Sequence, residues 1–343
     1  MATWFDESRL DDESVLASND AVLRTLAETG ARVRRAAGDA AEATVEAVLR
    51  AEELSRPRAV IAAGPDSRLL RAVLEPWCPV PFVAWPGPAL PGWAGSLDLV
   101  VVLAPDGGDT GTASAVAEGV RRGCQVVVAC PPGSLVAEHA AGRWSTILPA
   151  GARDQLATAV VVLEYLHRVS LGPEADADQV ADALDHVAIA CSPHRDLAVN
   201  PAKMLAIALA DTNPVVWGGS SLAARAARRV AETIRRATGQ SAIAGDAEHL
   251  LPLIEAARPR DVFDDPFAEG GGEVRPMLLV FDDLTDEPVV REDRGRLQAA
   301  ASSHGVRVET VTAEGDTEIA RYASLVLNGR YAAEYLRVGL VDD

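Results

Sequence analysis

The chain has 343 residues, of which 48% are hydrophobic, so it can form two domains of ordinary size with buried cores. This composition excludes an intrinsically disordered protein. The formal net charge is −18 at pH 7, and a chain this acidic repels DNA, RNA and anionic membrane surfaces. We therefore expect neither nucleic acid nor a membrane as a partner.

The cysteines and the N-terminal residues indicate a cellular location. Cys78, Cys124, Cys130 and Cys191 form no CxxC pair, and three of them lie in or beside apolar runs. This pattern is typical of reduced core cysteines. The N-terminal residues MATWFDESRLDDESV lack a basic region followed by an apolar stretch, and no run reaches the roughly 18 apolar residues of a membrane-spanning helix. We expect a cytoplasmic protein.

The first half of the chain begins with helices and continues as alternating strands and helices. Long helical patterns rich in Ala, Leu, Val and Arg occupy residues 11–54. Short apolar runs then predict buried strands at 58–64, 81–85, 97–103, 124–130 and around 145–148. Glycine loops and helices separate these strands, and a further helix follows at 152–169. The alternation predicts a parallel sheet covered on both faces.

The second half repeats the first. The polar segment LGPEADAD at 171–178 predicts a boundary, which gives domains at 1–172 and 173–343. Asn200 and Pro201 are typical of a helix start. Strand patterns at 213–219, 241–244, 275–283 and 305–311 follow in the same order as in the first half. We therefore predict an α/β fold of two doubly wound, flavodoxin-like domains related by internal duplication.

Residues 261–274, DVFDDPFAEGGGEV, have no counterpart in the first half. The segment is predicted to be a loop between the second and third strands of the second domain. Its glycines permit either a mobile lid or a solvated connection, and both interpretations stay open.

Four loops follow strands and are the expected place for a ligand, because open α/β sheets bind ligands at the carboxyl ends of their strands. They span 63–67, 104–110, 218–221 and 281–286. A phosphate site needs glycines, hydroxyl donors and a helix N-terminus. The candidate ligand-binding residues are Gly64, Ser67, Gly107, Thr110, Thr112, Gly218, Gly219, Ser220 and Ser221. The serines and threonines among them are equally typical of helix N-caps.

Three segments resemble a known family. They are LDLVVVLAPDGGDTGTASAVAEGVRRGCQVVVA at 97–129, NPAKMLAIALADTNPVVWGGSSLAARAARR at 200–229, and SLVLNGRYAAEYLRVGL at 324–340. Together they resemble the bifunctional phosphoglucose/phosphomannose isomerases, which have two sugar isomerase (SIS) domains, and more closely the divergent actinobacterial members. The resemblance implies reversible aldose to ketose isomerisation of glucose 6-phosphate or mannose 6-phosphate. It also implies a homodimer and no cofactor.

The chain departs from this family where the chemistry takes place. The family's phosphate loop, Ser-x-Ser-Gly-x-Thr, corresponds to residues 104–109, which keep the motif's glycine as Gly107, lose its serines and threonine, and carry Asp106 and Asp109. A carboxylate about 4 Å from a phosphate costs roughly 4 kcal/mol per charge pair at an effective dielectric constant near 20. The family's glutamate base has no counterpart between Ala237 and Ala244.

The surviving candidates for catalysis are few. His249, beside Glu248, is the nearest histidine to the position of the family's ring-opening acid, and a helix-face residue is the alternative interpretation. Arg153 lies within two positions of the family's active-site arginine. We name Arg153, His249 and Glu248 as the candidate catalytic residues.

Two functions follow, and we favour the first. The chain is a non-catalytic SIS-fold protein that binds a sugar phosphate or related carbohydrate derivative as a sensor or scaffold. Alternatively, it is an active isomerase that uses the three candidate residues and an acid of 261–267. A divalent-metal site is a weaker interpretation, and we predict none. It would use Asp106, Asp109, Asp282, Asp283 and Asp286. A dinucleotide-binding fold is the remaining alternative, and it is disfavoured because no GxGxxG follows a predicted strand.

Overall fold

The computed structural model describes residues 3–151, 153–257 and 275–342. The chain divides into two compact units. We call Thr29–Asp182 the central unit, and Met1–Glu28 together with Ala183–Asp343 the terminal unit. This division differs from the predicted domains 1–172 and 173–343, because it falls inside helix α8 (Ala177–Ala190) and groups residues 1–28 with the second half.

The central unit contains a five-stranded parallel sheet in the order β3-β2-β4-β5-β6. Its strands are β2 (Val60–Ala63), β3 (Phe82–Trp85), β4 (Leu99–Leu103), β5 (Gln125–Cys130) and β6 (Ser145–Pro149). In the middle of the sheet, Ala62 pairs with Ala84 on one side and Val101 on the other. Every residue of β2 and β4 is buried, as expected for parallel strands covered on both faces.

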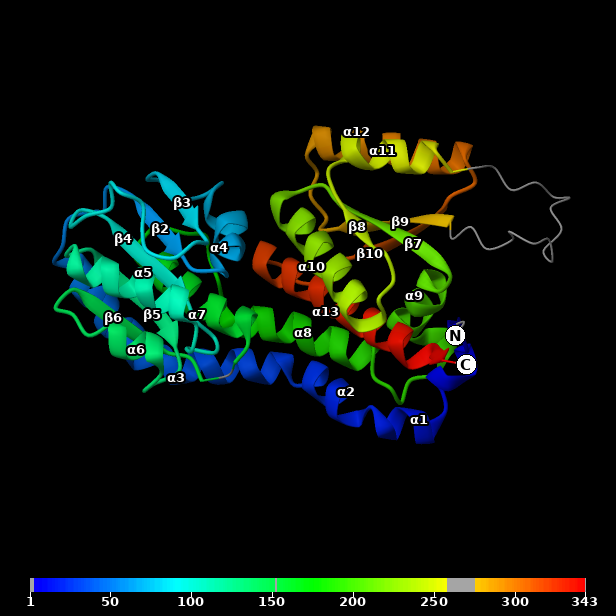
Figure 1. Ribbon diagram of the computed structural model, residues 1–343, viewed down its shortest axis with the longest axis horizontal. Helices are drawn as coiled ribbons and strands as arrows, with labels where there is room; N and C mark the ends of the chain where they lie inside the picture. The colour runs from blue at the N-terminus through cyan, green and yellow to red at the C-terminus, as the bar shows by residue number, and fades with distance from the viewer. Residues whose placement is uncertain (1–2, 152, 258–274, 343) are drawn as a thin grey trace, which may run out of the picture. The chain divides into compact units, whose positions relative to one another are not determined.

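Helices cover both faces of this sheet (Figure 1). They are α3 (Thr29–Glu52), α4 (Ser67–Leu74), α5 (Thr110–Arg121), α6 (Leu135–His139) and α7 (Gln155–Arg168). Val100 and Val102 of β4 pack against α5 and α6 in one core cluster. Helix α7 packs against β4, β5 and helix α3. Because side chains alternate along a strand, Val101 and Val127 point away from that cluster.

The terminal unit repeats this arrangement with four parallel strands in the order β10-β9-β7-β8. They are β7 (Thr212–Gly218), β8 (Ile243–Ala244), β9 (Arg275–Asp282) and β10 (Arg307–Thr312). In both sheets the second strand lies outside the first, and the third and fourth continue on the other side. The predicted fold class, two doubly wound α/β domains in the same strand order, is confirmed.

The helices of the terminal unit also form two layers, which lie on opposite sides of β7 and β9 (Figure 1). One layer is α11 (Ala247–Glu255) and α12 (Pro288–Ser303), which share a core cluster with both strands. The other is α9 (Pro201–Leu209), α10 (Ser221–Thr238) and α13 (Glu318–Gly339). Helix α9 begins as predicted, with the Asn200 side chain accepting the amide hydrogens of Ala202 and Lys203.

The first residues of the chain pack against the last helix and strand, which explains why they belong to the terminal unit. This segment contains β1 (Thr3–Phe5), η1 (Glu7–Leu10), α1 (Glu13–Ser18) and α2 (Asp20–Ala27), and η2 (Leu197–Val199) precedes α9. Strand β1 pairs antiparallel with β11 (Leu340–Asp342). A Cβ on Gly339 would lie 2.2 Å from the Phe5 ring, so only glycine fits at this position.

Further expectations concern other features of the chain. The four cysteines are free, as predicted. Within the described residues, no helix is long and apolar enough to cross a membrane. The segment 261–274 lies outside the described residues. The buried residues Val33, Ala36 and Ala40 lie on α3, which packs on α7 and β6 and so covers the sheet of its own unit. The homodimer stays a prediction.

Candidate functional site

Helix α5 begins in the loop that corresponds to the phosphate loop of the resembling family. Asp109 is the N-cap residue of this helix. Its Oδ2 accepts hydrogen bonds from both the backbone N–H and the hydroxyl of Thr112, each at 2.6 Å. These bonds hold the pKa of Asp109 below its ordinary value, and the bond from the Thr112 hydroxyl has the largest effect. The chain's own carboxylate therefore engages donors at the start of α5 that could otherwise bind an anion.

The rest of this loop is held against α6. Gly107 has a φ of +65°, and a Cβ there would lie 2.4 Å from the Cβ of Ser134. Ser134 caps α6 by accepting the N–H of Ala137 at 3.3 Å. Asp106 and Thr110 are exposed on either side of this tight turn. Gly107 is therefore needed for the loop to pack against α6.

The loop after β2 lies against the start of α5. Gly64 has a φ of +90°, and a Cβ there would lie 3.0 Å from the Thr112 hydroxyl oxygen. Ser67, the first residue of α4, is only 1% exposed. Its hydroxyl has no hydrogen-bond partner among the described residues. We call the loops 63–67 and 104–110, together with Thr112 at the start of α5, the loop cluster. Ser67 is its unsatisfied group, and a buried hydroxyl without a partner is unfavourable by roughly 1 to 3 kcal/mol.

The start of α7 contributes residues that the sequence did not single out. The side chain of Gln155 donates a hydrogen bond to Asp66 and so joins α7 to the loop after β2. Asp154 caps α7 and accepts from Nε of Arg32 at 3.2 Å. The sequence signals here are the helix predicted at 152–169 and the candidate Arg153, and neither points to Gln155 or Asp154.

Arg153 lies at this helix start. It is exposed and has a left-handed backbone with a φ of +48°. It directly precedes the residues that join α7 to the loop after β2. Of the three candidate catalytic residues, Arg153 is the one that lies in the central unit.

The glycines and serines at the end of β7 serve packing and capping. A Cβ on Gly218 would lie 2.3 Å from the backbone of Ala223, and one on Gly219 would lie 2.2 Å from Val290. Ser220 caps α10 by accepting the N–H of Ala223 at 3.0 Å, and its hydroxyl donates to Asp283. Ser221 is exposed. This loop is therefore built mainly for close approach of β7, α10 and α12.

The acids at the end of β9 are engaged within the terminal unit. Asp282 accepts two hydrogen bonds of 2.7 Å from Arg294. Asp286 lies 3.3 Å from Arg291. In the described ranges, no group of three or more His, Cys, Asp or Glu side chains is arranged to hold a metal ion.

Glu248 and His249 lie in the first turn of α11, and both are exposed. The His249 side chain is 81% exposed, and its Nδ1 lies 3.9 Å from Asp246. Both residues belong to the terminal unit, whereas Arg153 belongs to the central unit. Their catalytic role stays a prediction.

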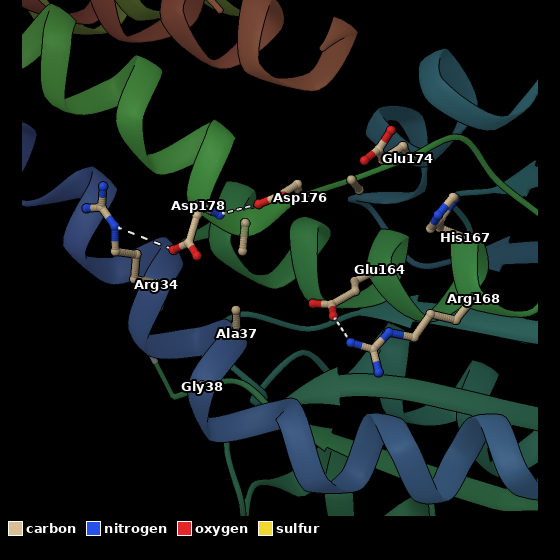
Figure 2. Close-up of a pocket in the computed structure, with 11 residues that line it drawn as sticks. Arg34, Ala37, Gly38, Glu164, His167, Arg168, Glu174, Asp176 and Asp178 are labelled. Carbon is tan, nitrogen blue, oxygen red and sulfur yellow. Dashed lines mark hydrogen bonds and ion pairs between the residues drawn. The ribbon is translucent and has the colours of Figure 1, made fainter. Parts of the chain in front are cut away.

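An open pocket of about 530 Å³ lies in the central unit, away from the loops that follow the strands (Figure 2). Helices α3, α7 and α8 line it with charged side chains of both signs. Arg168 donates to Glu164 at 2.5 Å, and Arg34 lies 3.8 Å from Asp178. Asp176 accepts the backbone N–H of Asp178 at 2.8 Å. Because most of these charged groups are paired with one another, this pocket is a weaker candidate than the loop cluster.

Comparison with known proteins identifies the fold. Residues 198–339 match the model of the bacterial phospho-glucose isomerase C-terminal SIS domain. The chain has a SIS fold. A search of curated protein sequences gives no match.

Solved structures with the SIS fold cover almost the whole chain. Tagatose-6-phosphate ketose/aldose isomerase from Escherichia coli is 13% identical with a TM-score of 0.62, covering 96% of this chain and 93% of that one. The C-terminal domain of glucosamine-fructose-6-phosphate aminotransferase from Francisella tularensis is 11% identical with a TM-score of 0.57, covering 90% and 96%. At these identities the similarity shows the fold alone. The loop cluster around Ser67 and Thr112 lies in the central SIS unit.

Proposed function

We propose that the chain binds a sugar phosphate or a related carbohydrate derivative through the loop cluster of its central SIS unit, as a sensor or scaffold without isomerase activity. The Asp109 carboxylate bonded to the start of α5 is the observation that carries the second part of this proposal, the absence of isomerase activity, because it occupies donors at the family's phosphate loop. The names of the two solved relatives support the ligand class, because each name includes that of a sugar phosphate.

The ligand is proposed to contact Ser67 and Arg153. The buried Ser67 hydroxyl lacks a partner in the described structure, and a sugar hydroxyl would satisfy it. Arg153 is an exposed guanidinium at the start of α7, which Gln155 joins to the loop that holds Ser67. A guanidinium binds phosphate oxygens by two parallel hydrogen bonds. The phosphate would thus bind away from the Asp109 carboxylate.

Isomerisation also requires a base that moves a proton between two sugar carbons. Such a group must come within hydrogen-bonding reach of that proton. Glu248 and His249 are exposed on α11, and Nδ1 of His249 lies 3.9 Å from Asp246. The pKa of Asp109 is already lowered by its bonds to Thr112, so this carboxylate is a poor proton acceptor. These observations favour binding without turnover.

The test is an NMR assay of the full chain with fructose 6-phosphate and with mannose 6-phosphate, together with calorimetric titration of both compounds. We expect binding and no interconversion at high protein concentration. Interconversion of the two sugars would replace this proposal with the active isomerase. A protein that neither turns over nor binds these compounds would contradict the sugar-phosphate ligand.

Replacing Ser67 by alanine tests the proposed contact. We expect Ser67→Ala to leave the free energy of unfolding unchanged or slightly higher, because the lost hydroxyl has no partner in the free protein. Affinity for fructose 6-phosphate should fall about fivefold, the loss expected for one neutral hydrogen bond. The matched control is Ser114→Ala on the exposed side of α5. If Ser67→Ala binds as tightly as the wild type, Ser67 is no part of the site.

A further inference from the structure

A groove in the central unit lies at the end of the sheet opposite to the loop cluster. It runs between the last turns of α3 and the end of α7. Leu99 and Gln125, the first residues of β4 and β5, line its floor. Its main part has a volume of about 290 Å³, and a narrower part continues from it. Both parts share Ala51, Leu54, Gln125 and Tyr165.

Two polar side chains face this groove without partners in the part of the chain that the structure describes. Tyr165 is only 3% exposed, yet its hydroxyl makes no hydrogen bond there. The Gln125 side chain also makes none, although Val127, on the same face of β5, is apolar. Burial raises the pKa of Tyr165 to about 12, so its hydroxyl keeps its proton at neutral pH and can donate. Neither the Tyr165 hydroxyl nor the Gln125 amide is among the fully buried side-chain atoms without a partner, so both are open to the groove and can bond to a ligand there.

The charge of the groove is opposite to that of the chain. Arg56 lines the main part and Arg50 the narrow part, and no acid lines either. Arg56 donates to the carbonyl of Ser170 at 3.3 Å. Arg50 donates to the carbonyl of Ser145 at 3.3 Å and to Thr146 at 3.2 Å. Neither guanidinium has an acidic partner in the described residues, in contrast to Arg34 and Arg168 of the 530 Å³ pocket (Figure 2).

The remaining walls are apolar. They consist of Ala51, Leu54, Pro57, Leu99, Val169 and Leu171. A volume near the lower end of the range for ligand pockets, apolar walls and a few convergent polar groups are typical of a site for a compact small molecule. The Arg56 guanidinium, which has no acidic partner among the described residues, attracts an anion.

We propose that this groove binds a small amphipathic anion, a carboxylate or phosphate monoester that carries a short apolar body. The anionic group meets the Arg56 guanidinium, and the Tyr165 hydroxyl and Gln125 amide donate to its oxygens. The apolar body lies against Leu54 and Leu99. This site is separate from the proposed sugar site, which lies at the other end of the same strands.

The experiment is calorimetric titration of the full chain with hexanoate and with phenyl phosphate, which separates the two head groups. 1-Hexanol lacks the charge and inorganic phosphate lacks the apolar body, so both should bind at least tenfold more weakly than the better anion. Arg56→Gln should weaken binding of that anion about tenfold, and Tyr165→Phe about fivefold. The control Arg121→Gln removes the same charge from an exposed side chain of α5, which covers the other face of the sheet. This variant should bind the anion like the wild type.

Two further measurements separate binding from folding and from the sugar site. Tyr165→Phe should keep the unfolding midpoint of the wild type, because the Tyr165 hydroxyl makes no hydrogen bond among the described residues and faces the groove. Ser67→Ala should bind hexanoate and phenyl phosphate unchanged. The proposal is overturned if neither anion binds at millimolar concentrations, or if Arg56→Gln and Tyr165→Phe bind as tightly as the wild type. A large loss of stability in Tyr165→Phe would also overturn it.

Discussion

Asp109→Asn is expected to raise the affinity of the chain for fructose 6-phosphate by roughly tenfold, which corresponds to about 1.4 kcal/mol. The asparagine oxygen can still accept the N–H and hydroxyl of Thr112, so the cap of α5 is kept. The substitution removes only the negative charge. The repulsion between a carboxylate and a phosphate is much smaller in solvent than in a protein interior, and Asp109 is exposed, so we expect a moderate gain.

Calorimetric titration at low and high salt tests this electrostatic origin. The difference in affinity between Asp109→Asn and the wild type should shrink as salt screens the charge. The control Asp106→Asn neutralises an exposed acid of the same loop, which does not bond to Thr112, and should have a smaller effect. Equal affinities for all three proteins would mean that the ligand binds far from the start of α5.

The pH dependence of this effect follows from the lowered pKa of Asp109. A carboxyl whose folded pKa lies below its unfolded value stabilises the protein above the unfolded value, about 3.9 for aspartate. That stability is lost as pH falls through the lower, folded value. Asp109 is therefore still ionised at pH 5, and moderate acid should not relieve the repulsion between this carboxylate and a sugar phosphate in the wild type.

The strands and their order could be predicted because their signals are local or repeated. Strand β4 is an apolar run buried on both faces, and its pattern at 97–103 contains the observed Leu99–Leu103. The second sheet could be predicted because its strands recur in the same sequence order. Periodicity and repetition thus suffice for a doubly wound sheet.

The docking of residues 1–28 could not be predicted, because it depends on contacts between distant parts of the chain. Phe5 fills the space beside Gly339, and Asp11 binds Lys203. The acidic opening of the sequence has no periodicity that points to a partner. The helical patterns at 11–54 all fall in the first predicted domain, whereas the structure places α2 and α3 in different units.

The candidate site shows the same limit at the scale of single residues. Serine after a strand fits a helix cap and a ligand contact equally well. The structure makes Ser220 a cap bonded to Ala223, whereas the Ser67 hydroxyl is buried without a partner. Tyr165 and Gln125 carried no sequence signal, because an aromatic residue on an apolar helix and a glutamine at a strand start are ordinary.

Lys203→Met is expected to lower the free energy of unfolding of the terminal unit by about 3 kcal/mol, near the lower end of losses for breaking a buried ion pair. Lys203, the single lysine of the chain, is 0% exposed. Its Nζ donates to Asp11 at 2.6 Å and to the carbonyls of Pro193 and Arg195 at 3.0 and 2.9 Å. Methionine fills a similar volume, so the loss comes mainly from these bonds.

Thermal unfolding measures this loss as a decrease in Tm of roughly 6 to 12 °C, at about 2 to 4 °C per kcal/mol for a unit of this size. Asp11→Asn is the matched variant, because it keeps the lysine and its two carbonyl acceptors. The Asp11 side chain is 45% exposed, so its loss should be about 1 kcal/mol. Equal stabilities of Lys203→Met and the wild type would show that α9 does not hold residues 1–28 through this lysine.

Acid unfolding separates the ion pair from the carbonyl bonds of Lys203. The hydrogen bond from Lys203 is the largest cause that lowers the pKa of Asp11. The stability from Asp11 is therefore complete above its unfolded pKa, about 3.9, and is lost as pH falls through its folded value. In Lys203→Met this contribution is already absent, so the difference in unfolding free energy from the wild type should shrink below pH 4. The part that persists at low pH belongs to the bonds from Lys203 to Pro193 and Arg195, which do not titrate there.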